Sequence, residues 1–152
     1  MKRVIIVGAG VVGLMCAVRL AKLGVRVTVL EAHDENTSVW GPTASASAAG
    51  MLAPLNEQAS PLDALAFASF DLWRARRDGA PWGDALRFDG GIMLVRDASE
   101  AAKITAHARS LGRACEALSP GKFRKHTGLR ANVARALFIP DEGVADPLRT
   151  LS

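Results

Sequence analysis

Cysteine is scarce in this sequence, and its scarcity narrows the chemistry that the protein can carry out. Only two of the 152 residues are cysteine, Cys16 and Cys115, and they lie far apart. Neither belongs to a Cys-x-x-Cys pair, which argues against a zinc ribbon and against a dithiol redox site. Cys16 falls within an apolar helical pattern, so we expect a buried and inert thiol there. The low cysteine content favours a reducing, cytoplasmic setting.

Long hydrophobic runs are also missing. The apolar run at residues 4–7 is too short for the hydrophobic region of a signal peptide, and glycines interrupt it at once. No stretch approaches the length that a membrane span requires. The formal net charge is only +4, from 19 basic and 15 acidic side chains. This balance suits an anionic cofactor, whereas no recognition module for nucleic acid accompanies it.

Metal-binding and nucleophile patterns are missing as well. The three histidines are well separated and none has His-x-x-x-His spacing, so we expect no metal site. Ser45 and Ser47 lack the strained Gly-x-Ser-x-Gly turn that exposes a serine nucleophile. The sequence therefore assigns a catalytic role to no residue.

The amino-terminal residues have the pattern of a strand, a helix and a second strand. Residues 4–7 form a β-branched run that is typical of a buried parallel strand. Residues 12–23 change to helical spacing, and Gly24 follows where the helix would end. Residues 25–30 then alternate as a second strand, and a right-handed crossover would place both strands in one parallel sheet. We predict an α/β fold that begins with a Rossmann-like βαβ unit.

Turn and capping signals predict further elements along the chain. Ser60 and Pro61 would cap and begin a helix that Gly79 ends, and Ser99 would begin another. The remaining expected elements are strands on either side of Gly90 and Gly91, a short helix after Ser119, a strand at residues 136–139, a turn at residues 140–143, and a helix start at Asp146 and Pro147.

The segment Gly8-Ala9-Gly10-Val11-Val12-Gly13 is a Gly-x-Gly-x-x-Gly motif in the context that a dinucleotide site requires. It follows a predicted strand, opens a helix, and lies in a βαβ unit whose second strand ends at Glu31. Gly8 permits the tight turn, Gly10 lets a pyrophosphate approach the backbone, and Gly13 lets the helix pack closely on the sheet. The helix amino terminus offers N–H groups and partial positive charge to the phosphates. Glu31 would bind ribose hydroxyls and repel a 2′-phosphate, which disfavours NADP. The motif alone leaves FAD and NAD open.

Beyond the motif, the sequence resembles one family of flavoproteins. Residues 4–31 resemble the amino-terminal fingerprint of FAD-dependent oxidoreductases. Residues 41–52, Gly-Pro-Thr-Ala-Ser-Ala-Ser-Ala-Ala-Gly-Met-Leu, are similar to the second flavin loop of the D-amino-acid oxidase and glycine oxidase family. Residues 88–93 and 138–147 resemble later landmarks of that family. The resemblance implies an FAD-dependent oxidoreductase that oxidises the C–N bond of an amino acid or amine by hydride transfer to the flavin.

The resemblance also implies which residues hold the cofactor. The glycine-rich turn would bind the FAD diphosphate through backbone groups, and Glu31 with Ala32 would bind the adenosine ribose. Thr43 or Ser45 would contact the diphosphate. The loop that ends at Met51 would approach the flavin ring, where small residues allow close contact. The implied cofactor-binding residues are Gly8, Gly10, Val11, Val12, Gly13, Glu31, Ala32, Thr43, Ser45, Ala49, Gly50 and Met51.

Domain organisation and completeness are further expectations. Residues 1–60 would form the FAD-binding segment, and residues 61–152 a helical segment and the start of an α+β substrate domain interleaved with it. Because a helix start at Asp146 is followed by very few residues, we expect the carboxy-terminal half to be missing. Three interpretations of this stay open: a fragment, a cleaved product, or one half of a split enzyme whose other half comes from a second chain. Two alternatives stay open: a non-catalytic FAD-binding subunit of a larger complex, and an NAD-dependent Rossmann dehydrogenase.

Overall fold

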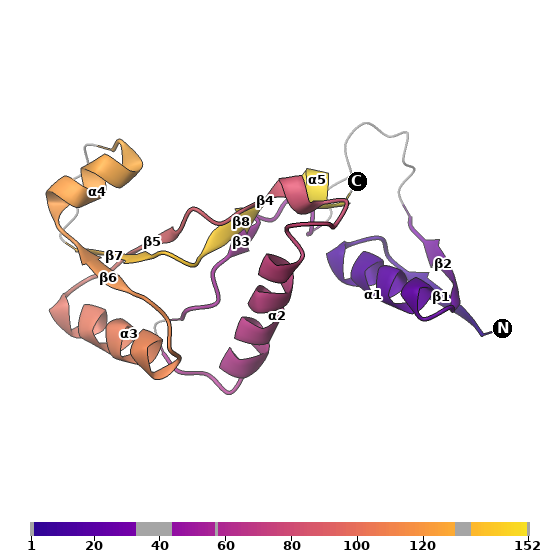
Figure 1. Ribbon diagram of the computed structural model, residues 1–152, viewed down its shortest axis with the longest axis horizontal. Coiled ribbons are helices and arrows are strands. Elements are labelled where there is room, and N and C mark those ends of the chain that lie inside the picture. Colours follow the sequence, from indigo (N-terminus) through magenta and orange to yellow (C-terminus); the bar gives the residue numbers. More distant parts are fainter. Residues whose placement is uncertain (1, 33–43, 57, 130–134, 152) are drawn as a thin grey trace. The chain divides into compact units, whose positions relative to one another are not determined.

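The computed structural model describes residues 2–32, 44–56, 58–129 and 135–151, which form two compact units. The first unit comprises residues 1–50 and 145–152, and the second comprises residues 51–144. Both contain helices and strands (Figure 1), so the predicted mixture of α and β structure is confirmed. Among the described residues, no helix is long and apolar enough to cross a membrane.

The first unit contains the predicted βαβ arrangement. Strand β1 (Arg3–Val7) leads into helix α1 (Val11–Lys22), and the chain returns as strand β2 (Arg26–Leu30). The two strands are parallel, with Arg3 opposite Arg26 and Val7 opposite Leu30. Helix α5 (Pro147–Leu151) also belongs to this unit and lies against α1.

One expectation about α1 is wrong. Gly24 ends the helix as predicted, with φ of 75° and its N–H donating to Ala21. Cys16, however, is exposed rather than buried. It shares one face of the helix with Val12 and Arg19, at i, i+4 and i+7 spacing, and that face is solvent-exposed. Because α1 is apolar on several sides, its sequence does not indicate which face packs on the sheet.

The second unit contains two small sheets. One has the order β3-β8-β4 and the other has the order β5-β7-β6, in which both pairings of β7 are antiparallel. Predicted strands flanking Gly90 and Gly91 are present, but they belong to different sheets. The strands are β3 (Met51–Leu52), β4 (Leu86–Arg87), β5 (Gly91–Leu94), β6 (Glu116–Leu118), β7 (Ala136–Ile139) and β8 (Gly143–Ala145), and a 3₁₀ turn η1 (Gly83–Ala85) precedes β4.

Strand β7 is the centre of the core of the second unit, because it is covered on both faces. Leu137 and Ile139 pack with Ile104 of helix α3 (Ala98–Ser110), which is fully buried. Ala136 points the other way and packs with Phe123 of helix α4 (Pro120–Thr127). This alternation is the period of two expected for a strand between two layers. Figure 1 shows α3 and α4 on opposite sides of β7.

Helix caps explain where the predicted starts are right and where they are wrong. Ser119 caps α4 as predicted, by accepting a hydrogen bond from the Lys122 N–H at 3.3 Å. Helix α3 begins earlier than predicted, because Asp97 is its cap and accepts from the Glu100 N–H at 2.9 Å. The overlooked signal is the spacing Asp97-x-x-Glu100, an acidic version of the capping box.

Helix α2 (Asp63–Ala75) begins later than predicted, and Ser60 is not its cap. Residues 60–62 form a separate turn, in which the Ser60 N–H donates to the Asp63 carboxylate and the Leu62 N–H donates to the Ser60 hydroxyl. The helix ends at Ala75, before Gly79. The serine and proline therefore mark a turn in front of the helix rather than its first residues.

Candidate cofactor site

The glycine-rich segment forms the tight turn between β1 and α1. Gly8 has φ of 99°, a conformation that side-chain-bearing residues rarely adopt, and its N–H donates to the Leu30 carbonyl at 2.7 Å. This bond continues the pairing of β1 with β2. The turn is therefore fixed directly at the carboxyl end of both strands, which is where open α/β sheets bind ligands.

Gly13 allows α1 to lie against this turn. A Cβ atom at Gly13 would come within 2.1 Å of the Gly8 carbonyl oxygen and 3.4 Å of the Ile6 side chain. No real contact is that short, so only glycine permits the observed packing. The third glycine of the motif therefore has the close-packing role that the sequence predicted.

The amino terminus of α1 presents its backbone N–H groups beside Ser45. The Val11 N–H donates to the Ser45 hydroxyl oxygen at 3.1 Å, and the first intrahelical bond runs from Leu14 to Gly10 at 3.0 Å. Among the described residues, none accepts from the N–H groups of Val12 and Gly13. Unpaired N–H groups and the helix dipole together suit an anion.

Gly10 and Ser45 lie so close together that a side chain at position 10 would contact the Ser45 hydroxyl. A Cβ atom at Gly10 would lie 3.1 Å from the Ser45 hydroxyl oxygen, so a side chain at this position would crowd the space beside the helix start. Because the Ser45 oxygen accepts from Val11, its own O–H can donate outward. Ser45 thus lies where a phosphate oxygen bound at the helix terminus would accept that hydrogen bond.

Glu31 lies directly after β2 and holds the turn. Its two carboxylate oxygens accept from the Ala9 N–H at 2.7 Å and from the Ala32 N–H at 2.8 Å. The sequence predicted a ribose ligand here but missed the bond to Ala9, because the backbone of a motif residue gives no signal in the sequence. The exposed carboxylate is placed both to fix the turn and to accept from hydroxyl groups beside it.

Replacing Glu31 with glutamine should weaken FAD binding about tenfold, which corresponds to about 1.4 kcal/mol. The neutral amide loses the charge-assisted bond to Ala9 and accepts ribose hydroxyls more weakly. Fluorescence titration of FAD measures the dissociation constant. Glu116→Gln, which neutralises an exposed glutamate of the second unit, is the matched control. Equal affinity in both variants would exclude the role assigned to Glu31.

The loop predicted to face the flavin is described from Ala44 onward, and Thr43 lies outside the described residues. Ala49 is exposed, and Gly50 has φ of 68°. A Cβ atom at Gly50 would come within 1.9 Å of the Ala145 carbonyl, while the Gly50 carbonyl accepts from the Ala145 N–H at 2.8 Å. Met51 is the first residue of β3 and is 74% exposed.

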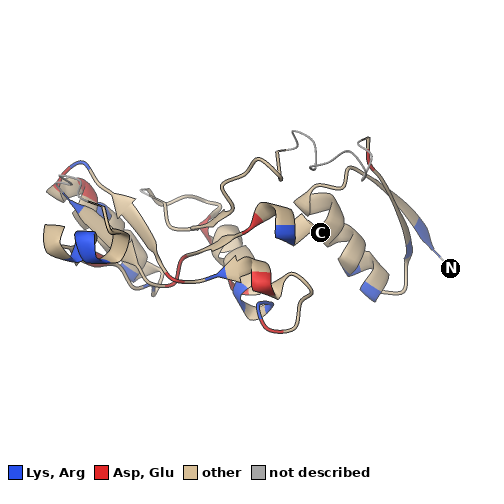
Figure 2. Cartoon of the chain, turned by 90° about the horizontal axis from the view of Figure 1, so that it is seen from above, with Lys and Arg blue, Asp and Glu red and all other residues tan. Residues whose placement is uncertain are grey.

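The structure thus brings most of the predicted diphosphate and ribose residues together in the first unit. The glycine-rich turn, Ser45, Glu31 and Ala32 lie around one helix amino terminus. Met51 belongs to the second unit. In the parts of the chain that the structure describes, no three metal-binding side chains gather into a possible metal site. Figure 2 shows that both acidic and basic residues occur on several elements of the chain.

These residues fit a dinucleotide diphosphate. A glycine with positive φ makes the turn, a second glycine leaves space beside the helix terminus, and the N–H groups there provide donors for phosphate oxygens. The carboxylate after β2 provides the acceptor for a ribose.

Comparison with known proteins gives a family match over almost the whole chain. The model of the family described as "DAO: FAD dependent oxidoreductase" matches residues 3–152. A search of curated proteins finds no significant match.

Solved structures of amino-acid oxidases and dehydrogenases have a similar fold. Glycine oxidase from Geobacillus kaustophilus is 29% identical with a TM-score of 0.74, and the match covers 99% of this chain and 43% of that protein. Glycine oxidase from Bacillus cereus is 24% identical with a TM-score of 0.74, covering 99% and 42%. L-proline dehydrogenase from P. horikoshii is 21% identical with a TM-score of 0.77, covering 99% and 39%. The chain therefore spans less than half the length of these proteins.

Proposed function

Because the chain belongs to the FAD-dependent oxidoreductase family, we propose that it supplies the FAD-binding part of an enzyme that oxidises a C–N bond of an amino acid or amine. The observation that carries this proposal is the turn at Gly8–Gly13, with Glu31 and Ser45 bonded to its backbone. An NAD-dependent dehydrogenase would share such a turn. The family match favours FAD.

The proposed reaction removes a hydride from the carbon that bears the substrate nitrogen. When bound, FAD supplies the acceptor for that hydride and its two electrons. The nitrogen loses a proton, and the resulting imine is hydrolysed by water to a carbonyl compound and an amine or ammonia. In this chemistry the residues of this chain bind and orient the cofactor. Gly50 and Met51 are proposed to lie beside the flavin, and no described residue is assigned as an acid or base.

The two units support an interleaved arrangement of the two proposed functional parts. We propose that residues 1–60 provide the FAD-binding segment and that residues 61–152 begin the substrate domain. The support is that residues 145–152 return to the first unit after the second unit has been completed.

Exposed apolar residues of the sheet support a further proposal, that additional α/β structure completes the FAD-binding part. The exposed face of β1 and β2 carries Ile5 (65% exposed), Val7 (84%) and Leu30 (51%), together with Arg3, Arg26 and Thr28. Apolar side chains exposed in this way favour a cover in water. The matched glycine oxidase is more than twice as long as this chain, so we propose that the cover is the equivalent carboxy-terminal half, supplied by the same or a second chain.

The test of the proposed reaction is reduction of bound FAD by substrate without oxygen. The FAD-loaded protein, together with the carboxy-terminal half, is mixed anaerobically with glycine, D-amino acids, sarcosine and L-proline in turn. The proposal predicts that at least one of them bleaches the visible flavin band and yields a carbonyl product. Bleaching by NADH but by none of the amines would overturn the assignment of the C–N bond as substrate.

A further inference from the structure

Glu142 is a buried acid that the proposed cofactor site does not use. It lies directly before β8 in the second unit, and only 5% of its surface is exposed. Its carboxyl group accepts a hydrogen bond from the Leu55 N–H. Its other oxygen, Oε1, is buried and has no hydrogen-bond partner among the described residues. Burying a carboxyl with half of its acceptors unsatisfied is costly, so its position calls for a physical explanation.

Glu142, directly before β8, contacts two other segments of the second unit: the chain that follows β3, and the glycines around the start of β5. Strands β3 and β8 pair over only two residues, Met51 with Val144 and Leu52 with Gly143. Beyond this short pairing, the Glu142 carboxyl holds the same segment by accepting the hydrogen bond from the Leu55 N–H. On its other side, its main-chain carbonyl accepts from the Gly90 N–H at 2.9 Å. A Cβ atom at Gly91 would overlap the Glu142 carboxyl, so this glycine makes room for the acid.

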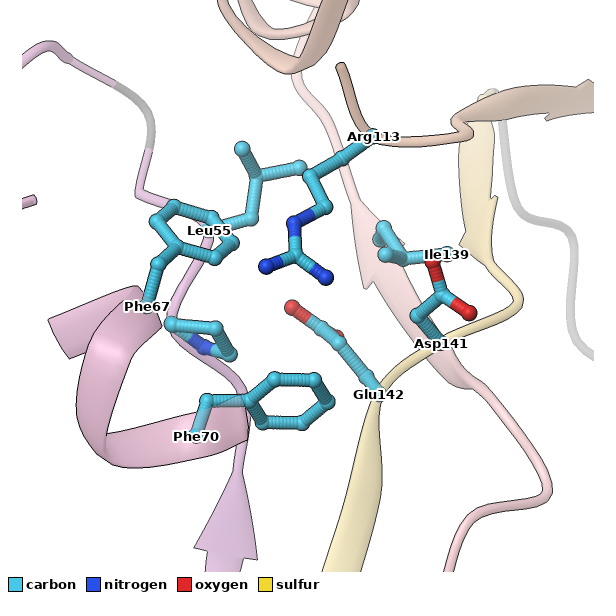
Figure 3. Close-up of a pocket in the computed structure, with 8 residues that line it drawn as sticks. Leu55, Phe67, Phe70, Arg113, Ile139, Asp141 and Glu142 are labelled. Atoms are coloured by element: carbon cyan, nitrogen blue, oxygen red, sulfur yellow. The ribbon is translucent and has the colours of Figure 1, made fainter. Parts of the chain in front are cut away.

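The cavity beside Glu142 is too small for a substrate. It measures about 10 Å³, about the room for one water molecule, and apolar side chains such as Leu55, Phe67 and Phe70 form much of its wall (Figure 3). A ligand site for an amino acid would be far larger. The acid therefore acts on the chain itself rather than on a bound molecule.

Neighbouring charges do not neutralise Glu142. The guanidinium of Arg113 points towards it from the segment before β6 (Figure 3), but pairs with Asp71 of α2 at 2.9 Å. Asp141, the adjacent residue, pairs with Arg74 of α2 at 2.7 Å. Among the described residues, the Cys115 thiol also interacts electrostatically with Glu142.

We propose that Glu142 is a positioning residue, whose buried side chain fixes the backbone leaving β3 and, through that two-residue strand, the orientation of Met51. The importance of Met51 for the flavin rests on the proposed function. The link between Glu142, Leu55 and Met51 is independent of that function. Burial raises the pKa of Glu142 to about 7, so its charge changes under conditions in which the fold can be observed. Ionisation strengthens its bond to the Leu55 N–H, because a carboxylate is the better acceptor.

Two-dimensional ¹H–¹⁵N NMR of the full chain tests this proposal directly. The Leu55 amide should titrate with a midpoint near pH 7. The ¹³C-labelled methyl group of Met51 should titrate with the same midpoint, while that of Met15 in the first unit should not. Both titrations should disappear in Glu142→Gln and persist in the control Glu116→Gln.

Each outcome of this experiment has a defined meaning. An invariant Leu55 amide in the wild-type chain would overturn the role of Glu142. A titrating Leu55 with an invariant Met51 would overturn the link to Met51. In the FAD-bound protein, the visible flavin spectrum should shift with the same midpoint, and this shift should be lost in Glu142→Gln. Failure of the wild-type chain to bind FAD would count against the proposed function and leave the Leu55 titration as an independent result. If Glu142→Gln does not fold, the wild-type titration and the Glu116→Gln control decide the proposal.

Discussion

Replacing Gly13 with alanine should destabilise the first unit by about 3 kcal/mol and abolish measurable FAD binding. The added methyl group would have to occupy space 2.1 Å from the Gly8 carbonyl oxygen, which is backbone and cannot rotate away. Helix α1 must therefore move off the turn, and the N–H groups at its amino terminus move with it. Urea unfolding followed by circular dichroism measures the first effect, and FAD fluorescence titration measures the second.

Gly121→Ala is the matched control for this variant. Gly121 lies in α4, has no positive φ, and a Cβ atom there would meet nothing within 4 Å. Alanine is the better helix former, so this variant should be as stable as the wild type or more stable by up to about 1 kcal/mol. If Gly13→Ala behaved like Gly121→Ala, the close packing of α1 on the Gly8 turn would not exist in solution.

Stability of the second unit should fall as the pH rises from 4.5 to 7, because of Glu142. Burial raises the pKa of this carboxyl from 4.5 to about 7, so the folded state holds a proton that the unfolded state has already lost. The free energy of unfolding therefore decreases with pH across this window and is level above it. We expect a decrease of about 2 kcal/mol, allowing for partial screening by solvent.

Urea titrations at pH 5 and pH 8, followed by tryptophan fluorescence, measure this effect, because two of the three tryptophans, Trp73 and Trp82, lie in the second unit. In Glu142→Gln the difference between the two pH values should shrink by the amount assigned to Glu142. Asp63 acts elsewhere: hydrogen bonding from the Ser60 N–H lowers its pKa below 3.8, so its contribution is lost only as the pH falls towards that lower range. A variant with the full wild-type pH dependence would show that Glu142 does not cause it.

The βαβ unit was predictable because its signals are local. Apolar periodicity identified β1, α1 and β2, and Gly24 identified the end of the helix. The glycines of the turn also followed from sequence, since Gly8 has a positive φ and a Cβ atom at Gly13 would meet the Gly8 carbonyl. Ser119 gave the start of α4 for the same reason: a cap and its helix are neighbours in the chain.

What the sequence did not reveal depends on contacts between distant residues. The exposure of Cys16 is decided by which face of α1 meets the sheet, and the helix is apolar on several sides. The start of α2 depends on Asp63, which binds Ser60 on one side and His107 of α3 on the other. The burial of Glu142 could not be predicted, because its hydrogen-bond partner Leu55 is far away in the sequence. The sequence shows only a charged residue between two apolar strands.

Binding of FAD through the turn at Gly8–Gly13 can be tested by the cofactor content of the purified protein. The protein is supplied with FAD, separated from the excess, and denatured so that the released cofactor can be identified and counted. We expect FAD at close to one per chain in the wild type and none in Gly13→Ala. A folded wild-type chain that retains no FAD, or a Gly13→Ala variant that retains as much as the wild type, would contradict it.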